Sequence, residues 1–415
     1  MRAFHDFLLS SAPTSFSYLR ELEFSSYIKA DDLHIVVDIL TNATNLRSLA
    51  LAISLGSAEE IGQDIAEAII SLSKLQSLTF DYGYDNVEHT VLKRLQAPLK
   101  YLSLQEQDSP LLLLSNFQDT LEYLYLEFAV LEDVDVPVSC VNLTRLRLNY
   151  CPRPVLSVLV NTFPNLQVLS LKSGRAIVRL DYERQGSNLR ELRTKNLSLQ
   201  AHRRLNSLTS LTTDEAGLYT MGLQSEIDSI IIPCAFASSD YVDYNLNWLH
   251  TSLRSLRPRH LQLTCDVTTR LQQALSIGTE RLDRLDLLVK YSGSLLKDIV
   301  DGICTALKSL PVRMIFCDIS MYYAKRTRVI PPNEWNRETI LQKIMLAAPQ
   351  VAYIKLVVTT LSENVSYWTV AGDGDERRLH EVKSKSEIAQ INRMFLPVQL
   401  QVSCLNQCYG YHTCD

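Results

Sequence analysis

Tyrosine, arginine and lysine side chains recur at matching offsets inside a repeated phrase, and their chemistry suits recognition of another protein. The phrase is Leu-x-x-Leu-x-Leu, and the candidates stand between its leucines or directly after them. They are Tyr101, Tyr123, Tyr125, Arg145, Arg147, Lys172 and Arg193. Tyrosine and arginine are enriched at the energetic hot spots of protein interfaces. They also suit any exposed strand, tyrosine through β-propensity and arginine through its solvated head group.

Cations beside tyrosines favour an acidic or phosphorylated peptide as the partner. Glu21 and Glu23 occupy the same offsets in the first repeat, so this surface is not uniformly basic. We therefore expect a protein partner on this surface, with the basic residues in the middle repeats.

Residues suited to catalysis show no recognisable arrangement in the sequence. The histidines stand singly along the chain, at His5, His34, His89, His202, His250, His260, His380 and His412. No HExxH motif, phosphate-binding Gly-rich loop or Gly-x-Ser-x-Gly elbow occurs. We expect that the protein is not an enzyme and takes no cofactor.

The strongest candidate metal ligands are Cys404, Cys408, His412 and Cys414, close together near the C-terminus. Their spacing matches no common zinc template. GDGDE at 372–376 resembles part of a calcium loop but lacks the remaining ligand spacing. We expect no metal site, and we interpret the other cysteines, scattered singly among apolar residues, as small core residues.

Charge and hydropathy favour neither nucleic acid nor membrane as a partner. The formal net charge is -5, and the basic stretches at 202–205 and 376–385 are short. The apolar run at 110–115 is far shorter than the roughly 20 residues of a spanning helix. The odd number of cysteines, 9, suits a reducing compartment. We expect an intracellular, cytoplasmic or nuclear, monomeric protein.

The repeated phrase itself predicts the elements that position the candidate residues. It begins at Leu19, Leu46, Leu75, Leu99, Leu121, Leu143, Leu166, Leu189 and Leu208, at intervals of 19 to 29 residues. Weaker copies lie at Ile227, 260–265, Leu282, 312–317 and 351–356. The alternating leucines predict a short strand with one buried face, which has to stack on its neighbours to be stable.

Segments with apolar residues at helical spacing separate the strands and predict helical crossovers. They cover 31–45, 62–74, 86–97, 154–165, 241–252, 267–277, 295–311 and 336–349. The fold class that follows is an α/β solenoid, a horseshoe with parallel strands on the concave face and helices on the convex face. We expect a lead at 1–16, the solenoid at 17–360, a helical C-terminal cap at 361–398 and a disordered tail at 399–415.

The phrase resembles that of the leucine-rich-repeat family, Leu-x-x-Leu-x-Leu-x-x-Asn/Cys, over roughly residues 17–360. Cys151 occupies the ninth position of the repeat from Leu143, whereas other repeats carry Ala129, Gly174, Gln107 or Gly83 there. The irregular repeats, and the segment SYWTVAGDGDERRLHEV at 366–382, are similar to the repeat regions of fungal F-box/leucine-rich-repeat proteins.

This second resemblance implies a substrate-recognition subunit of an SCF-type ubiquitin ligase. A cullin-RING ligase adaptor would be a partner only if an F-box lies upstream, because we find no Leu-Pro helical module before the repeat at Leu19. Two alternatives stay open. One is a stand-alone repeat adaptor, and the other is a GTPase-activating repeat protein that uses Arg145 or Arg147.

Overall fold

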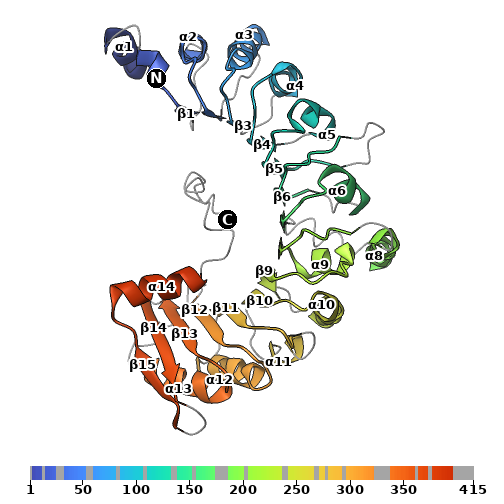
Figure 1. Cartoon of the computed structure of the whole chain (residues 1–415), viewed down its shortest axis with the longest axis vertical. Coiled ribbons are helices and arrows are strands. Elements are labelled where there is room, and N and C mark those ends of the chain that lie inside the picture. The colour runs from blue at the N-terminus through green and yellow to red at the C-terminus, as the bar shows by residue number, and fades with distance from the viewer. Residues whose placement is uncertain are drawn as a thin grey trace, which may run out of the picture. The chain divides into compact units, whose positions relative to one another are not determined.

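The structure is a computed structural model of the 415-residue chain, shown in Figure 1. It describes residues 2–11, 15–24, 32–52, 59–80, 85–105, 110–131, 138–151, 156–172, 186–200, 204–235, 242–265, 271–275, 279–291, 296–321, 337–359, 363–372 and 376–395. The chain forms two compact units, Met1–Ser225 (unit 1) and Glu226–Asp415 (unit 2). Each unit contains a sheet whose strands follow one another in chain order.

Unit 1 contains a parallel sheet in which every strand belongs to one copy of the leucine phrase. The strands are β1 (Glu21–Phe24), β2 (Ser48–Leu51), β3 (Ser77–Phe80), β4 (Tyr101–Gln105), β5 (Tyr123–Glu127), β6 (Arg145–Asn149), β7 (Val168–Lys172) and β8 (Ser210–Thr212). Each strand from β1 to β8 begins at the third residue of its phrase. The leucine spacing therefore predicted these strands correctly.

The helical segments of unit 1 precede, separate or follow these strands in sequence. They are α1 (Arg2–Ser11), η1 (Ser15–Tyr18), α2 (Leu33–Asn42), α3 (Glu59–Ile70), α4 (Asp85–Arg94), α5 (Pro110–Leu113), η3 (Leu114–Phe117), α6 (Leu156–Thr162), α8 (Gly186–Gln200) and α9 (Glu215–Met221). Helices α2, α3, α4 and α6 confirm the predicted crossovers. Figure 1 shows α2 to α6 on one side of the strands, and we call the opposite side of the unit 1 sheet its open face.

Strand register explains why the leucines repeat. Leu102, Leu124 and Leu146 are paired neighbours on β4, β5 and β6, and each is at most 1 % exposed. Successive side chains of a strand point to opposite faces, so the leucines pack toward the helices while the intervening residues stand on the open face. The residues that differ between repeats are therefore those that the core does not constrain.

The asparagine that precedes the phrase also has a structural role. The side-chain amides of Asn45, Asn142 and Asn165 donate to main-chain carbonyls of the preceding repeat, those of Ser17, Asp119 and Val141, at 2.7 to 2.9 Å. Such bonds satisfy turn carbonyls that neither helix nor sheet can pair. These asparagines therefore join successive repeats.

One predicted strand of unit 1 is a helix. The phrase that starts at Leu189 lies inside α8, so Arg193 is a helical residue and not a residue of the open face. Its third leucine position is occupied by Thr194, which is exposed. Leu189, Asn196 and Gln200 are buried, and their spacing of seven and four residues is that of one helix face. Leu-x-x-Leu alone suits either structure, and this segment packs as a helix against α9.

Unit 2 contains longer strands. Strands β9 (Ser229–Ala235), β10 (His260–Cys265), β11 (Arg284–Tyr291), β12 (Met314–Met321) and β13 (Tyr353–Thr359) are parallel, whereas β14 (Glu363–Ala371) and β15 (Arg378–Glu381) are antiparallel to their neighbours. The helices are α10 (Val242–Leu256), α11 (Leu271–Ala274), α12 (Leu296–Leu307), α13 (Arg337–Ala347) and α14 (Lys385–Phe395). The first four helices and β9–β13 match the predicted elements.

The C-terminal region differs from the helical cap expected over 361–398. Trp368 lies on β14, which pairs with the edge of β13, and β15 then pairs with β14. Within the region expected to form the helical cap, the charged stretch 376–394 is divided between β15 and α14. An unpaired strand edge leaves main-chain groups without partners. Strand β14 satisfies those of β13, and β15 in turn pairs with the outer edge of β14. The predicted tail at 399–415, with Cys404, Cys408, His412 and Cys414, lies outside the described residues.

Candidate protein-binding surface

Tyr101, Tyr123 and Arg145 form the first row of the open face of unit 1. They begin β4, β5 and β6, and strand register places them side by side. The rings of Tyr101 and Tyr123 are stacked, with centroids 4.8 Å apart and planes 12° from parallel. All three side chains are half-buried. The row therefore presents two stacked rings next to a guanidinium group.

The second row lies two residues further along the same strands and contains Ser103, Tyr125 and Arg147. The guanidinium carbon of Arg147 lies 5.3 Å from the ring centroid of Tyr125, within the range of a cation–π contact. Ser103 is fully buried. The second row thus combines an aromatic ring and a cation with a serine that is shielded from solvent.

A hydrogen-bond network holds the second row in place from the ends of the strands. The Tyr125 hydroxyl donates to Glu127 Oε2 at 3.1 Å and accepts from Asn149 Nδ2 at 2.8 Å. Arg147 Nε donates to Asn149 Oδ1 at 3.3 Å, and Gln105 Nε2 donates to Glu127 Oε2 at 2.9 Å. Because these hydrogen bonds hold both Tyr125 and Arg147, each side chain has one fixed orientation on the open face.

The electrostatics of the surface keep its tyrosines neutral. Burial raises the pKa of the Tyr125 hydroxyl, and the Glu127 carboxylate raises it further against the charge of Arg147. Burial also raises the pKa of Tyr123, against the opposing effects of Arg147 and Arg145. Both phenols therefore remain hydrogen-bond donors at neutral pH, and the positive charge on the surface is not cancelled by phenolate.

The structure adds Phe128 and Tyr150, which the sequence analysis missed. Each directly follows a strand, and each has a φ of 53° in the left-handed region. Their rings are stacked at 5.0 Å, and Phe128 is 50 % exposed. Lys172 Nζ lies 5.6 Å from the centroid of the Tyr150 ring. Both aromatics stand seven residues after the first leucine of their phrase, a signal that the sequence contains.

We call this set the tyrosine–arginine surface. It comprises Tyr101, Tyr123, Tyr125, Phe128, Arg145, Arg147, Tyr150 and Lys172. Within the part of the chain that the structure describes, Arg145, Arg147 and Lys172 form no ion pair with a carboxylate. Glu127, which neighbours Asn149 in register, is already bonded to Tyr125 and Gln105. The surface therefore carries positive charge that a partner can neutralise.

Arg193 is separate from this surface. It donates to the main-chain oxygen of Tyr219 and stacks on the Tyr219 ring, with its guanidinium carbon 4.5 Å from the centroid. Burial lowers its pKa. Arg193 therefore connects α8 to α9, and its inclusion among the open-face residues was wrong.

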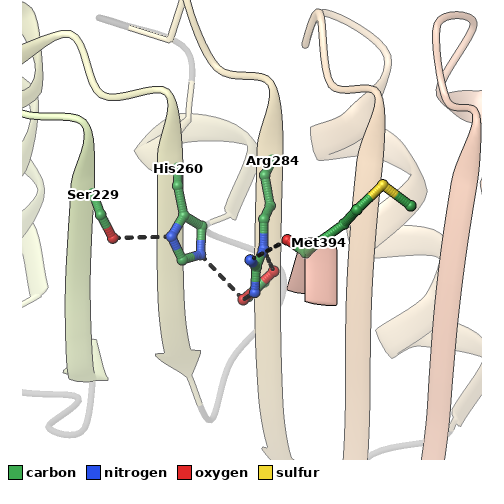
Figure 2. A network of polar contacts seen from close by, with 5 residues as sticks. Ser229, His260, Arg284 and Met394 are labelled. Atoms are coloured by element: carbon green, nitrogen blue, oxygen red, sulfur yellow. Dashed lines mark hydrogen bonds and ion pairs between the residues drawn. The ribbon is translucent and has the colours of Figure 1, made fainter. Parts of the chain in front are cut away.

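His260 of unit 2 is not isolated, contrary to the expectation from sequence. Its Nδ1 lies 2.9 Å from Ser229 Oγ, and its Nε2 lies 3.1 Å from Asp286 Oδ2 (Figure 2). These residue types also occur in charge-relay triads, in which the carboxylate stabilises an imidazolium. Here Arg284 binds both oxygens of Asp286, at 2.8 and 2.5 Å. The guanidinium already compensates the carboxylate charge, so we interpret the network as structural.

Three further features concern metal ligands, membrane-spanning helices and cysteines. In the described ranges no group of three or more His, Cys, Asp or Glu side chains could hold a metal ion. Among the helices that the structure describes, none combines the length and apolar character needed to cross a membrane. Cys140, Cys151, Cys265 and Cys317 are buried thiols, as expected of core residues, whereas Cys304 is half-buried.

Comparisons with known proteins found structural similarity but no match by sequence. No protein-family model matches the chain, and no curated protein matches it. Among solved structures, a chain of the crystal structure of the Rad7 and Elc1 complex in yeast is similar at a TM-score of 0.33 and 14 % sequence identity. The similarity covers 79 % of this chain and 85 % of that chain. At this TM-score, the likeness supports no argument about function.

Proposed function

We propose that the chain is a protein-interaction repeat protein that binds its partner through the tyrosine–arginine surface. The observation that carries the proposal is the set of oriented rings and cations on the open face of unit 1. Arg147 lies over the Tyr125 ring and is hydrogen-bonded to Asn149, yet it has no carboxylate partner in the described residues. Extended sheet faces of stacked repeats are typical binding surfaces.

The chemistry of the surface favours an acidic or phosphorylated peptide segment. Neighbouring strands lie about 5 Å apart, so Arg145 and Arg147 on β6 and Lys172 on β7 can contact successive acidic groups of one segment. Charge-assisted hydrogen bonds between arginine and carboxylate or phosphate are stronger than neutral ones. The stacked pairs Tyr101–Tyr123, where their strands begin, and Phe128–Tyr150, where their strands end, supply flat apolar area for the same segment.

We further propose that the bound partner is a substrate of an SCF-type ubiquitin ligase, with this chain as the recognition subunit. The support is the resemblance of the leucine phrase and of residues 366–382 to F-box/leucine-rich-repeat proteins. The sequence contains no recognisable F-box, so the proposal assigns no residue of this chain to adaptor binding. The alternative within the same class is an adaptor that works outside any ligase.

Affinity purification from native extract with mass spectrometry tests both levels of the proposal. The wild-type chain is compared with a site variant, Tyr123→Ala, Tyr125→Ala, Arg145→Glu, Arg147→Glu. The matched control variant is Tyr18→Ala, Lys93→Glu, Arg190→Glu, which changes exposed residues outside the open face. Far-UV circular dichroism has to show that all three chains are equally folded.

A partner retained by the wild type and the control but lost from the site variant supports the tyrosine–arginine surface. Co-recovery of cullin and its adaptor with all three chains supports the ligase setting, whereas their absence together with a site-dependent partner supports the stand-alone adaptor. Identical partners on the site variant and the wild type would contradict the assignment of the surface.

A further inference from the structure

In unit 2, helix α14 covers the sheet face opposite the buried strand residues. Ile315, Cys317 and Ile354 alternate with Met314, Phe316 and Tyr353 along β12 and β13. The first three are fully buried, whereas the second three are half-buried and pack against Ile388, Ile391 and Met394 of α14. The equivalent face of unit 1 carries the tyrosine–arginine surface instead. A helix of the same chain, α14, therefore covers this face of unit 2.

The apolar contact made by α14 is shallow. Its contact residues, Ile388, Ile391 and Met394, follow the i, i+3, i+6 spacing of one helix face. Ile391 is the one buried residue of 385–394, and Ile388 and Met394 are half-buried. Helix α2, of similar length, buries Leu33, Ile35, Val36, Ile39 and Leu40. Since stabilisation follows the apolar area removed from water, α14 is held far less firmly than a core helix.

A network of hydrogen-bonded polar side chains contacts the C-terminal end of α14. Arg284 donates to the main-chain oxygen of Met394 at 3.0 Å and to both oxygens of Asp286 (Figure 2). Asp286 is also hydrogen-bonded to His260, which contacts Ser229. The last carbonyls of a helix lack intrahelical partners and carry partial negative charge. A guanidinium fixed in this way recognises main chain, so it can receive any helix that ends there.

Two further contacts complete the face. Tyr367 donates its hydroxyl hydrogen to Asn392 Oδ1 at 2.9 Å. Lys355 Nζ lies 4.7 Å from the Phe316 ring centroid and 5.4 Å from that of Tyr367. Removal of α14 would expose these rings together with Met314 and Tyr353. An apolar patch rimmed by polar groups is the usual character of a helix-binding groove.

We propose that this face of unit 2 is a docking site for an amphipathic helix of a partner protein. Helix α14 occupies the site in the free chain, and the partner helix displaces it. The partner helix would carry apolar residues at i, i+3 and i+6 and would end with its carbonyls at Arg284. Three residues, Val382–Ser384, separate β15 from α14. A short tether gives an effective concentration on the order of 1 mM, which keeps the face closed until a tighter helix arrives.

Peptide binding to the full-length chain tests this proposal. The probe is a fluorescein-labelled synthetic peptide of residues 383–395, followed by fluorescence anisotropy. Ile391→Asp in the chain unseats α14 without changing the face beneath it, and Glu387→Lys, at an exposed position, is the control. We expect at least tenfold tighter peptide binding to Ile391→Asp than to the wild type or to Glu387→Lys. Adding Arg284→Met to Ile391→Asp should weaken the binding at least fivefold.

Hydrogen exchange of the wild-type chain keeps the test independent of any variant's folding. The amides of α14 should exchange at least tenfold faster than those of β11 to β13, because α14 opens locally while the sheet stays folded. Equal protection of α14 and these strands would overturn the proposal. So would a folded Ile391→Asp chain that fails to bind the peptide; if this chain does not fold, hydrogen exchange of the wild type decides alone.

Discussion

At the scale of single residues, Tyr125 is the centre of the proposed binding surface. Its ring supports Arg147, and its hydroxyl connects Glu127 on the same strand to Asn149 on the next. Three neighbouring side chains therefore contact this one tyrosine. The sequence placed Tyr125 on the open face, but the partners of its hydroxyl follow from strand register, which a single phrase does not reveal.

Loss of the Tyr125 hydroxyl should destabilise unit 1. Tyr125→Phe removes one donor and one acceptor from a half-buried network, so we expect a loss of about 1 to 2 kcal/mol in the free energy of unfolding. Urea denaturation measures this change. Tyr150→Phe is the matched control, because in the described residues its hydroxyl has no hydrogen-bond partner. Equal effects of the two substitutions would show that the network contributes nothing.

The contribution of Asp286 to stability should depend on pH. Burial alone would raise the pKa of this carboxyl, but hydrogen bonds from His260 and Arg284 and their positive charges lower it below the ordinary value. A folded-state pKa below the unfolded value means that the carboxylate stabilises the fold above the unfolded pKa of about 3.9. That stability is lost as the pH falls below this value.

We therefore expect Asp286→Asn to lower the thermal midpoint of unit 2 at pH 7, in line with a cost of about 3 kcal/mol for breaking a buried ion pair. The difference from the wild type should shrink as the pH is lowered below about 4. Calorimetry across this range measures it. A difference that stays constant from pH 7 to pH 3 would contradict the charged role of Asp286.

At the scale of elements, the sequence predicted the strands of unit 1 well, including β8, whose phrase carries Thr213 in place of the third leucine. It failed at α8, where Thr194 replaces the last leucine, and at 376–394, where β15 and α14 share a charged stretch. In both places the local pattern is compatible with more than one structure, and tertiary partners decide. Main-chain pairing with β14 determines β15, and packing against α9 determines α8.

Asn196 tests the account of α8. It is fully buried, its Oδ1 accepts from Leu156 N at 3.0 Å, and its Nδ2 donates to Thr220 O at 2.9 Å. This one side chain thus joins α6, α8 and α9. Asn196→Leu leaves two buried main-chain groups unpaired, so we expect a loss of about 2 to 4 kcal/mol in the free energy of unfolding.

The matched control is Ser198→Ala, since Ser198 is an exposed residue of the same helix. This control should change the free energy of unfolding by less than about 0.5 kcal/mol. If Asn196→Leu were as mild in chemical denaturation, the segment from Leu189 would not be packed as the structure shows.

At the scale of the whole molecule, the two units present different chemistry on their sheets. Unit 1 carries stacked rings and cations on its open face, although the formal net charge of the chain is -5. Unit 2 carries an apolar face covered by α14. Composition could not predict this division, because it depends on which repeats supply tyrosine and arginine and on where α14 folds back.

The sequence predicted the part of the candidate site that lies on the strands, because alternation along a strand determines which side chains share a face. Tyr101, Tyr123, Tyr125, Arg145 and Arg147 follow from the phrase and lie together on three neighbouring strands. Phe128 and Tyr150 did not follow, because their left-handed main-chain conformation lies beyond the strand pattern. Whether these residues bind a partner stays a prediction.

The most direct test of that prediction is the affinity of the purified chain for the partner recovered from extract. Biolayer interferometry at two salt concentrations would compare the wild type, the Tyr123→Ala, Tyr125→Ala, Arg145→Glu, Arg147→Glu variant and the Tyr18→Ala, Lys93→Glu, Arg190→Glu control. Hot-spot side chains cost about 2 kcal/mol or more each. We predict at least hundredfold weaker binding by the site variant, less than twofold change in the control, and wild-type affinity that falls with added salt. Equal affinity of the site variant and the wild type would contradict the tyrosine–arginine surface as the binding site.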